Sequence, residues 1–173
     1  ASTGKQILMS TGTARAEEVE HALEALTKYG SGPVTLMHCV STYPCKPEDA
    51  NMHTISWLRK RFNVPVGFSD HTEGISAPVT AVALGAKVIE KHFTLDKNLP
   101  GPDHAASMNP TELNALVTEV KRAYLALGTD QKAVDPGEME MRQTSRKSIV
   151  LTKDLEKGYR LRIIRKCFCI ASI

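Results

Sequence analysis

The chain has 173 residues, of which 42% are apolar and 24% are charged, and its 22 basic and 19 acidic side chains give a net charge of +3. This composition is ordinary for one soluble globular domain, or for one domain and a piece of another. The basic residues form no concentrated stripe, which argues against nucleic-acid binding. No apolar run approaches the ~20 residues of a membrane helix and no signal peptide is recognisable at Ala1, so we expect no membrane association and a cytoplasmic location.

The four cysteines, Cys39, Cys45, Cys167 and Cys169, include no C-x-x-C pair. A structural zinc site is therefore not expected. Cys39 lies in an apolar run, which predicts a small core residue, and Cys45 follows a proline in a predicted loop, which predicts a free thiol.

Short apolar runs alternate with longer amphipathic stretches over residues 1–130. The runs are typical of strands covered on both faces, and the stretches between them place apolar residues at helical spacing. The predicted strands span residues 6–10, 34–39, 64–69 and 86–93, and the predicted helices span residues 14–30, 51–62, 74–86 and 109–128. The last helix has Asn109 as its cap, Pro110 at its first position and Gly128 at its end.

Four βα units in succession, with short connections, imply an α/β fold with a parallel sheet. The sheet is either open and doubly wound or closed into a barrel, and the hydrophobic pattern does not choose between them. A complete (β/α)8 barrel takes about 250 residues, so four units in residues 1–130 would make half of one.

The pattern changes after Gly128. Residues 131–147 are polar and aperiodic, which predicts a linker. Residues 148–151 predict a strand, and residues 155–161 predict a turn into another. The segment 148–173 is too short to fold alone without a disulfide, a metal or a partner.

Each predicted strand ends in a compact polar segment. In chain order these segments are STGT (10–13), HCVSTYP (38–44), SDHT (69–72) and EKHF (90–93). Reactive groups gather at the carboxyl ends of parallel strands, because the loops converge there and the helix N-termini point their N–H groups at the same space. The functional site is therefore expected at this edge of the sheet.

His71 and His92 occupy equivalent positions at two successive strand ends, 21 residues apart. One intervening helix accounts for that separation, so the two imidazoles are expected side by side. Such a pair is suitable for binding a divalent metal. The alternative is that each histidine is only a hydrogen-bonded residue of the core or rim.

Hydroxyl side chains recur on the strand-to-helix turns. They belong to Ser10, Thr11, Ser41, Ser69 and Thr72. Together with the N–H groups of the turns, they predict a cradle for an anion, especially phosphate. Each one alone is more often a helix cap, so the clustering is the informative feature.

Several other polar residues have two interpretations each. The proline-braced PGPDH loop (100–104) would hold Asp103 over the strand ends for a substrate hydroxyl or for proton transfer, or Asp103 is a plain turn residue. Lys91 could form a Schiff base, or it is a salt-bridged lysine or a charge that faces the ligand. Asp70 could support the metal-binding histidines or cap the next helix, and the cap is favoured. His38 is expected to orient the following turn.

These motifs, taken together, closely resemble the N-acetylneuraminate (sialic acid) synthase family. The matching segments are ILMSTGTA, LMHCVSTYP, VGFSDHTEGI, VIEKHFTLDKNLPGPDHAASMNP and SIVLTKDLEKG, and the resemblance runs from residue 5 to about residue 161. It implies the last four βα units of a TIM (β/α)8 barrel, followed by the start of a small antifreeze-like (SAF) domain over residues 148–173. Family members condense phosphoenolpyruvate with N-acetylmannosamine or a related acetylated hexosamine and release phosphate.

The resemblance also implies roles for individual residues. His71 and His92 match the two metal ligands, normally for Mn²⁺ or Mg²⁺. Ser10, Ser41 and Ser69 match positions that contact the phosphoenolpyruvate phosphate, whereas Tyr43 and Asp103 match positions that face the acceptor sugar. His71, His92 and Asp103 are the expected catalytic residues, and a homodimer is the expected assembly.

In the family, four further βα units precede the segment that matches Ala1, and the final residues, RIIRKCFCIASI, do not resemble the family's second domain. We therefore expect these 173 residues alone to be inactive or very weakly active. Two other functions remain open: an aldolase that forms a Schiff base through Lys91, and a non-catalytic half-barrel that binds or assembles with a partner.

Overall fold

The computed structural model describes residues 3–151, 154–159 and 168–172. The chain divides into two compact units, Ala1–Gly128 and Thr129–Ile173, and each is described by itself. The boundary lies close to the predicted end of the βα units at residue 130.

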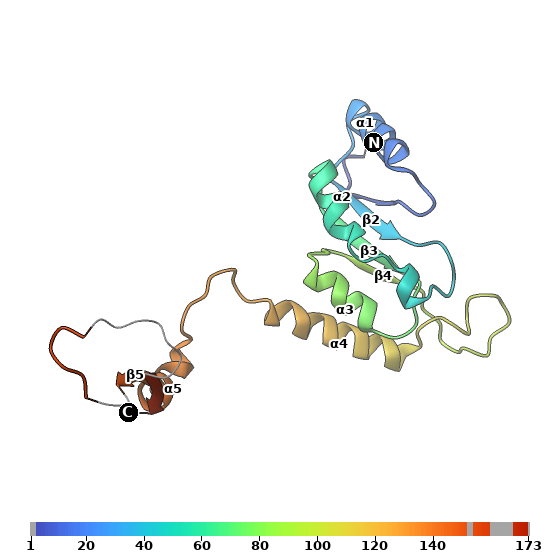
Figure 1. The fold of residues 1–173 in the computed structure, drawn as a ribbon. Coiled ribbons are helices and arrows are strands. Elements are labelled where there is room, and N and C mark those ends of the chain that lie inside the picture. The colour runs from blue at the N-terminus through green and yellow to red at the C-terminus, as the bar shows by residue number, and fades with distance from the viewer. Residues whose placement is uncertain (1–2, 152–153, 160–167, 173) are drawn as a thin grey trace. The chain divides into compact units, whose positions relative to one another are not determined.

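The first unit is a parallel sheet of four strands in the order β1-β2-β3-β4, with α-helices between and after the strands (Figure 1). The strands are β1 (Ile7–Ser10), β2 (Val34–Cys39), β3 (Val66–Asp70) and β4 (Ile89–Lys91); the helices are α1 (Ala16–Lys28), α2 (Thr54–Phe62), α3 (Ser76–Ala83) and α4 (Pro110–Ala126), with a short η1 at Pro47–Asp49. This arrangement confirms the predicted α/β fold of four successive βα units.

The element boundaries differ from the predicted ones mainly at β4. We expected a strand over residues 86–93, but β4 covers only Ile89–Lys91. It has one neighbour in the sheet, β3, and the ladder between them ends where Asp70 pairs with Lys91. The α4 boundary was predicted well, because the Asn109 side chain accepts a hydrogen bond from the Glu112 N–H and Pro110 occupies the first turn.

The core lies between one face of the sheet and the helices. Leu36, Val66 and Phe68 of the strands pack with Ile55 and Leu58 of α2, and all of them are buried. Burial of each such side chain contributes roughly 1.5–3 kcal/mol. Because successive strand residues point to opposite faces, the residues between these core positions lie on the other side of the sheet.

The predictions for the first two cysteines are only partly confirmed. Cys39 and Cys45 are both free thiols. Cys45 is the buried one, and burial raises the pKa of its thiol, whereas Cys39 is only half-buried. Cys167 lies outside the described residues, and Cys169 is described only as part of a strand.

The second unit contains η2 (Pro136–Glu138), α5 (Met139–Ser145) and an antiparallel pair of strands, β5 (Lys147–Leu151) and β6 (Phe168–Ser172). The predicted linker over residues 131–147 stays a prediction, and the structure places η2 and α5 within it. Asp135 accepts a hydrogen bond from the Gly137 N–H and Pro136 follows it, so the DPGE sequence is a helix-start signal that the aperiodic pattern hid. The predicted strand at 148–151 is confirmed. The predicted second strand falls largely on residues 160–167, outside the described residues, so the antifreeze-like assignment stays a prediction.

Among the described residues, no helix has both the length and the apolar character needed to cross a membrane.

His38 attaches the loop after β2 to the core. Its side chain faces the helices, is 5% exposed, and stacks on Phe68 with ring centroids 5.7 Å apart. The Nε2 atom lies 2.9 Å from the Ala50 carbonyl oxygen, which can only accept, so Nε2 carries the proton. This geometry supports the prediction that His38 orients the following segment. Burial lowers the pKa of His38, although the bond to Ala50 opposes the shift.

The lowered pKa of His38 predicts a loss of stability in mild acid. The pKa of a histidine in the unfolded chain is about 6.5. Below this pH the unfolded chain binds a proton at His38 that the folded chain does not, so each further pH unit lowers the free energy of unfolding by at most ~1.4 kcal/mol. His38→Gln keeps an N–H donor but does not titrate. We expect its urea-unfolding free energy to fall less than that of the wild type between about pH 7.5 and about pH 5.5. The exposed control His53→Gln should follow the wild type, and parallel curves for wild type and His38→Gln would contradict the assignment.

Candidate functional site

His71 and His92 lie side by side at the carboxyl ends of β3 and β4. They directly follow Asp70 and Lys91, the last pair in the ladder, and therefore point to the same face of the sheet. Their ring centroids are 5.1 Å apart and the rings are nearly perpendicular, at 82°. The predicted juxtaposition of the two imidazoles is confirmed.

The hydrogen bond made by His71 determines which of its nitrogens is free. Its Nδ1 atom lies 2.7 Å from the Val40 carbonyl oxygen in the loop after β2. Because a carbonyl oxygen can only accept, Nδ1 carries the proton, and Nε2 of the neutral ring keeps its lone pair. Histidines that bind metals usually donate their other ring N–H in this way, so His71 has the form that a ligand requires.

Aromatic and acidic neighbours surround His92. Tyr43 stacks on its ring with centroids 4.3 Å apart, and the same tyrosine meets His71 edge-on at 5.3 Å. The Nδ1 atom of His92 is 3.7 Å from Oδ2 of Asp103, a separation longer than that of a hydrogen bond. Three predicted site residues from three different loops thus converge around His92.

The loop 101–107 is attached to this cluster through a residue that the sequence analysis missed. Ser107 donates a hydrogen bond to the Asp103 carbonyl oxygen at 2.8 Å, and its Oγ lies 3.3 Å from the Tyr43 hydroxyl. The Nδ1 atom of His104 lies 2.8 Å from the Thr94 hydroxyl oxygen, and this hydrogen bond also holds the loop. A cavity of about 290 Å³ lies between the loop and the strand ends, lined by His92, Phe93, Gly101, Pro102, Asp103, His104 and Ser107.

The three serines predicted to contact phosphate lie at the ends of three adjacent strands, but their hydrogen bonds and burial differ. The Ser10 hydroxyl accepts from the Gly12 N–H at 3.3 Å, and Ser41 is exposed beside the same glycine. A Cβ atom at Gly12 would come within 2.5 Å of the Ser41 Oγ, so a side chain at this position would displace the Ser41 hydroxyl. The role of these serines in phosphate binding stays a prediction.

Ser69 is buried, and its hydroxyl lies 2.6 Å from Oε1 of Glu90, to which it donates. The sequence analysis assigned no role to Glu90. The parallel register pairs Ser69 with Glu90, and this pairing was the signal that could have identified the bond. The Ser69 proton is thus held by a carboxylate in this structure, which differs from a free anion cradle.

Two threonines and Asp70, by contrast, have their hydrogen-bonding groups occupied within the chain. The Thr11 hydroxyl donates to the Met37 carbonyl oxygen at 3.0 Å, and the Thr72 hydroxyl donates to Oδ1 of Asp70 at 2.8 Å. Asp70 is therefore not the cap of α3, as we had favoured. It closes a local turn by accepting also from the Thr72 N–H, and its second oxygen binds Lys91.

Lys91 is poorly placed for Schiff-base chemistry. Its ammonium lies 2.7 Å from Oδ2 of Asp70, and the two side chains are 4% and 0% exposed. A nucleophilic lysine must be neutral and must reach its substrate. A buried, ion-paired ammonium on the helix side of the sheet meets neither requirement, so the structure favours the salt-bridge interpretation.

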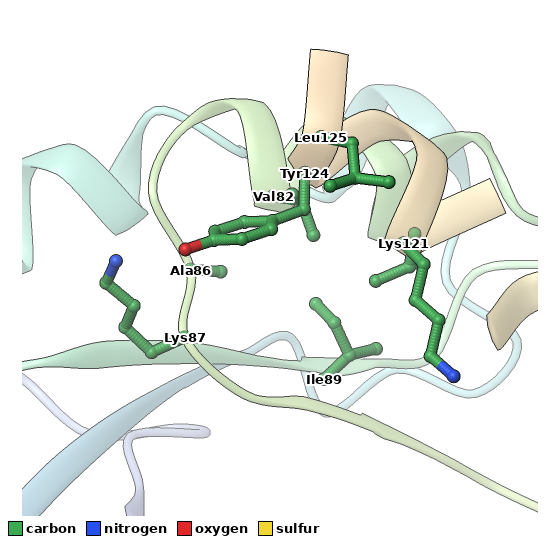
Figure 2. Close-up of a pocket in the computed structure, with 8 residues that line it drawn as sticks. Val82, Ala86, Lys87, Ile89, Lys121, Tyr124 and Leu125 are labelled. Carbon is green, nitrogen blue, oxygen red and sulfur yellow. The ribbon is translucent and has the colours of Figure 1, made fainter. Parts of the chain in front are cut away.

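A second, apolar groove lies away from these residues, between α4 and the connection from α3 to β4 (Figure 2). Its volume is about 620 Å³, and it is lined by Val82, Ala86, Lys87, Ile89, Val120, Lys121, Tyr124 and Leu125. Tyr124 reaches across it from α4 towards Ala86. Because Ala86 and Lys87 precede β4, the groove lies at the amino end of that strand and is separate from the histidine pair.

The described residues contribute two imidazoles to a possible metal site and no more. Within residues 3–151, 154–159 and 168–172, no group of three or more His, Cys, Asp or Glu side chains is placed to hold a metal. Any further ligands would have to come from water, from substrate or from elsewhere. A pair of ligands with open positions fits a catalytic ion better than a structural one.

Comparison with known proteins identifies the family of the chain. The model of the NeuB family matches residues 1–132. The chain belongs to the NeuB family. It is 44% identical, over 91% of its length, to N,N'-diacetyllegionaminic acid synthase of Campylobacter jejuni, and 37% identical, over 91%, to N-acetylneuraminate-9-phosphate synthase of Drosophila melanogaster.

The fold is also that of a solved NeuB-like enzyme. The N-acetylneuraminic acid synthetase of Leptospira borgpetersenii, crystallised with citrate, matches 83% of the chain with a TM-score of 0.73 and 41% identity. The chain covers 51% of that protein, 48% of the Campylobacter relative and 49% of the Drosophila relative. This NeuB-family chain thus spans about half the length of the proteins it matches, and its parallel sheet is a half-barrel.

The stacking of Tyr43 on His92 predicts a specific spectroscopic result. Tyr43→Phe keeps the aromatic ring but loses the hydroxyl that meets Ser107, whereas Tyr43→Leu removes the ring as well. We expect the ring protons of His92 to keep their ring-current shift in Tyr43→Phe and to lose it in Tyr43→Leu, measured by proton NMR. The aromatic pair should contribute about 0.5–1.5 kcal/mol to stability. Equal His92 shifts in all three proteins would contradict the stacked arrangement.

Proposed function

We propose that the protein containing this chain condenses phosphoenolpyruvate with N-acetylmannosamine, or a related acetylated hexosamine, to form a nonulosonic acid and inorganic phosphate. The observation that carries the proposal is the pair of adjacent imidazoles, His71 and His92, at the strand ends of a NeuB-family half-barrel. The relatives' names point to the same product class, since they are synthases of legionaminic acid and of N-acetylneuraminate 9-phosphate.

In the proposed reaction, C3 of phosphoenolpyruvate attacks the carbonyl carbon of the open-chain sugar, and the new C–C bond joins the two substrates. Water adds at C2, and phosphate then leaves with cleavage of its C–O bond. No oxidant or reductant is needed. The protein has to orient the two substrates, stabilise negative charge on the sugar oxygen and hold the phosphate as it departs.

His71 and His92 would hold a divalent cation, Mn²⁺ or Mg²⁺. The fit rests on the Nδ1–H of His71, which donates to Val40 and leaves Nε2 free. When bound, the cation supplies a Lewis acid for the sugar carbonyl. Asp103, whose carboxylate oxygen lies 3.7 Å from Nδ1 of His92, would orient that imidazole.

Tyr43 and Asp103 would orient the acceptor sugar. The ring of Tyr43 covers one side of His92, and its hydroxyl is turned to Ser107, so it offers the sugar an aromatic edge in a fixed position. The Asp103 side chain is 56% exposed beside the 290 Å³ cavity, where it can accept a hydrogen bond from a sugar hydroxyl. Ser10, Ser41 and Ser69 would contact the phosphate, for which Ser69 must exchange its bond to Glu90.

We place the reaction in the cytoplasm, as expected from the sequence, and the family resemblance leads us to expect a homodimer. The relatives are about twice as long as this chain, so half of the barrel's strand ends would come from residues outside it.

Metal binding tests the role of the imidazole pair directly. We expect calorimetric titration with Mn²⁺ to show one site in the wild-type chain, and to show at least tenfold weaker binding in His71→Ala and in His92→Ala, because each change removes a ligand. His53→Ala is the matched control, since His53 is an exposed histidine of the same chain and should leave affinity unchanged. Equal affinity in all four proteins would refute the metal assignment.

Turnover tests the proposed reaction. In a phosphate-release assay with phosphoenolpyruvate, N-acetylmannosamine and Mn²⁺, we expect the protein carrying the complete barrel to be active and the 173 residues alone to show little or no activity. Asp103→Asn in the complete protein should lower kcat/KM about 100-fold, which is the order expected when a group that positions the acceptor sugar is lost. Normal turnover by the 173-residue chain would contradict the first expectation, and an unchanged Asp103→Asn would contradict the second.

A further inference from the structure

We infer that the buried pair of Asp70 and Lys91, together with Thr72, is a positioning device that sets the separation of the two imidazoles. The inference rests on the proposed metal site, because it assigns these three residues a function in assembling that site. It concerns a cluster on the helix side of the sheet, which reaches neither substrate nor metal.

The cluster is closed and fully bonded. The Lys91 ammonium donates to Oδ2 of Asp70 at 2.7 Å and to the Thr72 carbonyl oxygen. Oδ1 of Asp70 accepts from both the N–H and the hydroxyl of Thr72, each at 2.8 Å. Within the part of the chain that the structure describes, no buried side-chain nitrogen or oxygen lacks a partner.

Its place in the chain links it to the histidines. Lys91 holds Asp70 and Thr72, the residues on either side of His71. Lys91 itself directly precedes His92. The ammonium of Lys91, the residue next to His92, therefore binds the Asp70 side chain and the Thr72 carbonyl on either side of His71. A displacement of Lys91 would move His71 and His92 relative to each other.

The other anchors of the two histidines lead to different elements. The His71 carbonyl accepts from the Cys45 N–H at 2.7 Å, and its ring binds Val40, so these bonds hold it to the loop after β2. The His92 carbonyl accepts from the Met108 N–H at 2.9 Å, which holds it to the start of α4. The Asp70–Lys91 pair connects β3 directly to β4, at the last paired residues before the imidazoles.

Stability alone does not explain a charged pair at this position. Replacing a buried ion pair by neutral groups of similar volume is often neutral or even stabilising, whereas removing one partner leaves an isolated buried charge and is strongly destabilising. An apolar pair would fill the same space between the sheet and the helices. What the ion pair adds is a fixed direction and length for the link between the two strands, which dispersion contacts do not provide.

The test is the paired substitution Asp70→Asn with Lys91→Met, which removes both charges together and keeps the volume and the acceptor for Thr72. The matched control is the exposed ion pair in which Nη2 of Arg61 lies 3.2 Å from Oε2 of Glu20. The control variant carries Arg61→Met together with Glu20→Gln. Two measurements are made on the full chain: Mn²⁺ affinity by calorimetry, and the strength of the proton NOEs between the His71 and His92 rings without metal.

We expect the Asp70/Lys91 double variant to keep a thermal midpoint close to that of the wild type, to bind Mn²⁺ at least tenfold more weakly, and to show weakened inter-ring NOEs. The control pair should change neither measurement. Wild-type affinity together with wild-type NOEs in a folded double variant would overturn the inference.

If the double variant does not fold, a second variant tests the positioning role. Thr72→Val removes only the hydroxyl that orients Asp70 and leaves both charges in place. It should weaken the inter-ring NOEs and lower Mn²⁺ affinity several-fold, whereas unchanged values would overturn the inference. If the wild type binds no Mn²⁺, the proposed metal function fails, and the metal-free NOEs still test the positioning role separately.

Discussion

The parallel register between β3 and β4 is the constraint on which the site depends. It pairs Asp70 with Lys91, and the alternation of side chains then sends these two residues to the helix side and His71 and His92 to the opposite face. A slip of one strand by one residue would bury its imidazole among the helices and separate Asp70 from Lys91. The apolar core beneath, with Phe68 and Leu36 fully buried, specifies this register because each core position fits one face only.

The remaining site residues lie on loops rather than on strands. Tyr43 arrives on the segment after β2 and packs on both imidazoles, while Ser107 and Asp103 arrive on the loop before α4. Each loop is attached to the histidines by a backbone bond, through Cys45 to His71 and through Met108 to His92. The two loops are therefore positioned by the histidines that they surround. The family's chemistry would depend on a cluster attached to the ends of two short strands.

Much of this arrangement could be predicted from periodicity and spacing. Apolar runs gave the four strands, helix signals such as Asn109–Pro110 gave the start of α4, and the 21-residue separation of His71 and His92 predicted their contact. The predictions failed where a side chain's partner depends on register or on loop conformation. Asp70 has the sequence context of a helix cap, yet its partner is a lysine on the next strand. Ser69 likewise finds Glu90 across the sheet, and nothing in its own segment identifies that partner.

The most direct test of the account is pulsed electron paramagnetic resonance of Mn²⁺ bound to the ¹⁵N-histidine-labelled protein. Coupling from the nitrogens of two histidines is the predicted result, and it should fall to that of one histidine in either single alanine variant of the pair. A spectrum without any histidine nitrogen coupling would show that the ion, if bound at all, lies elsewhere, and would contradict the central claim.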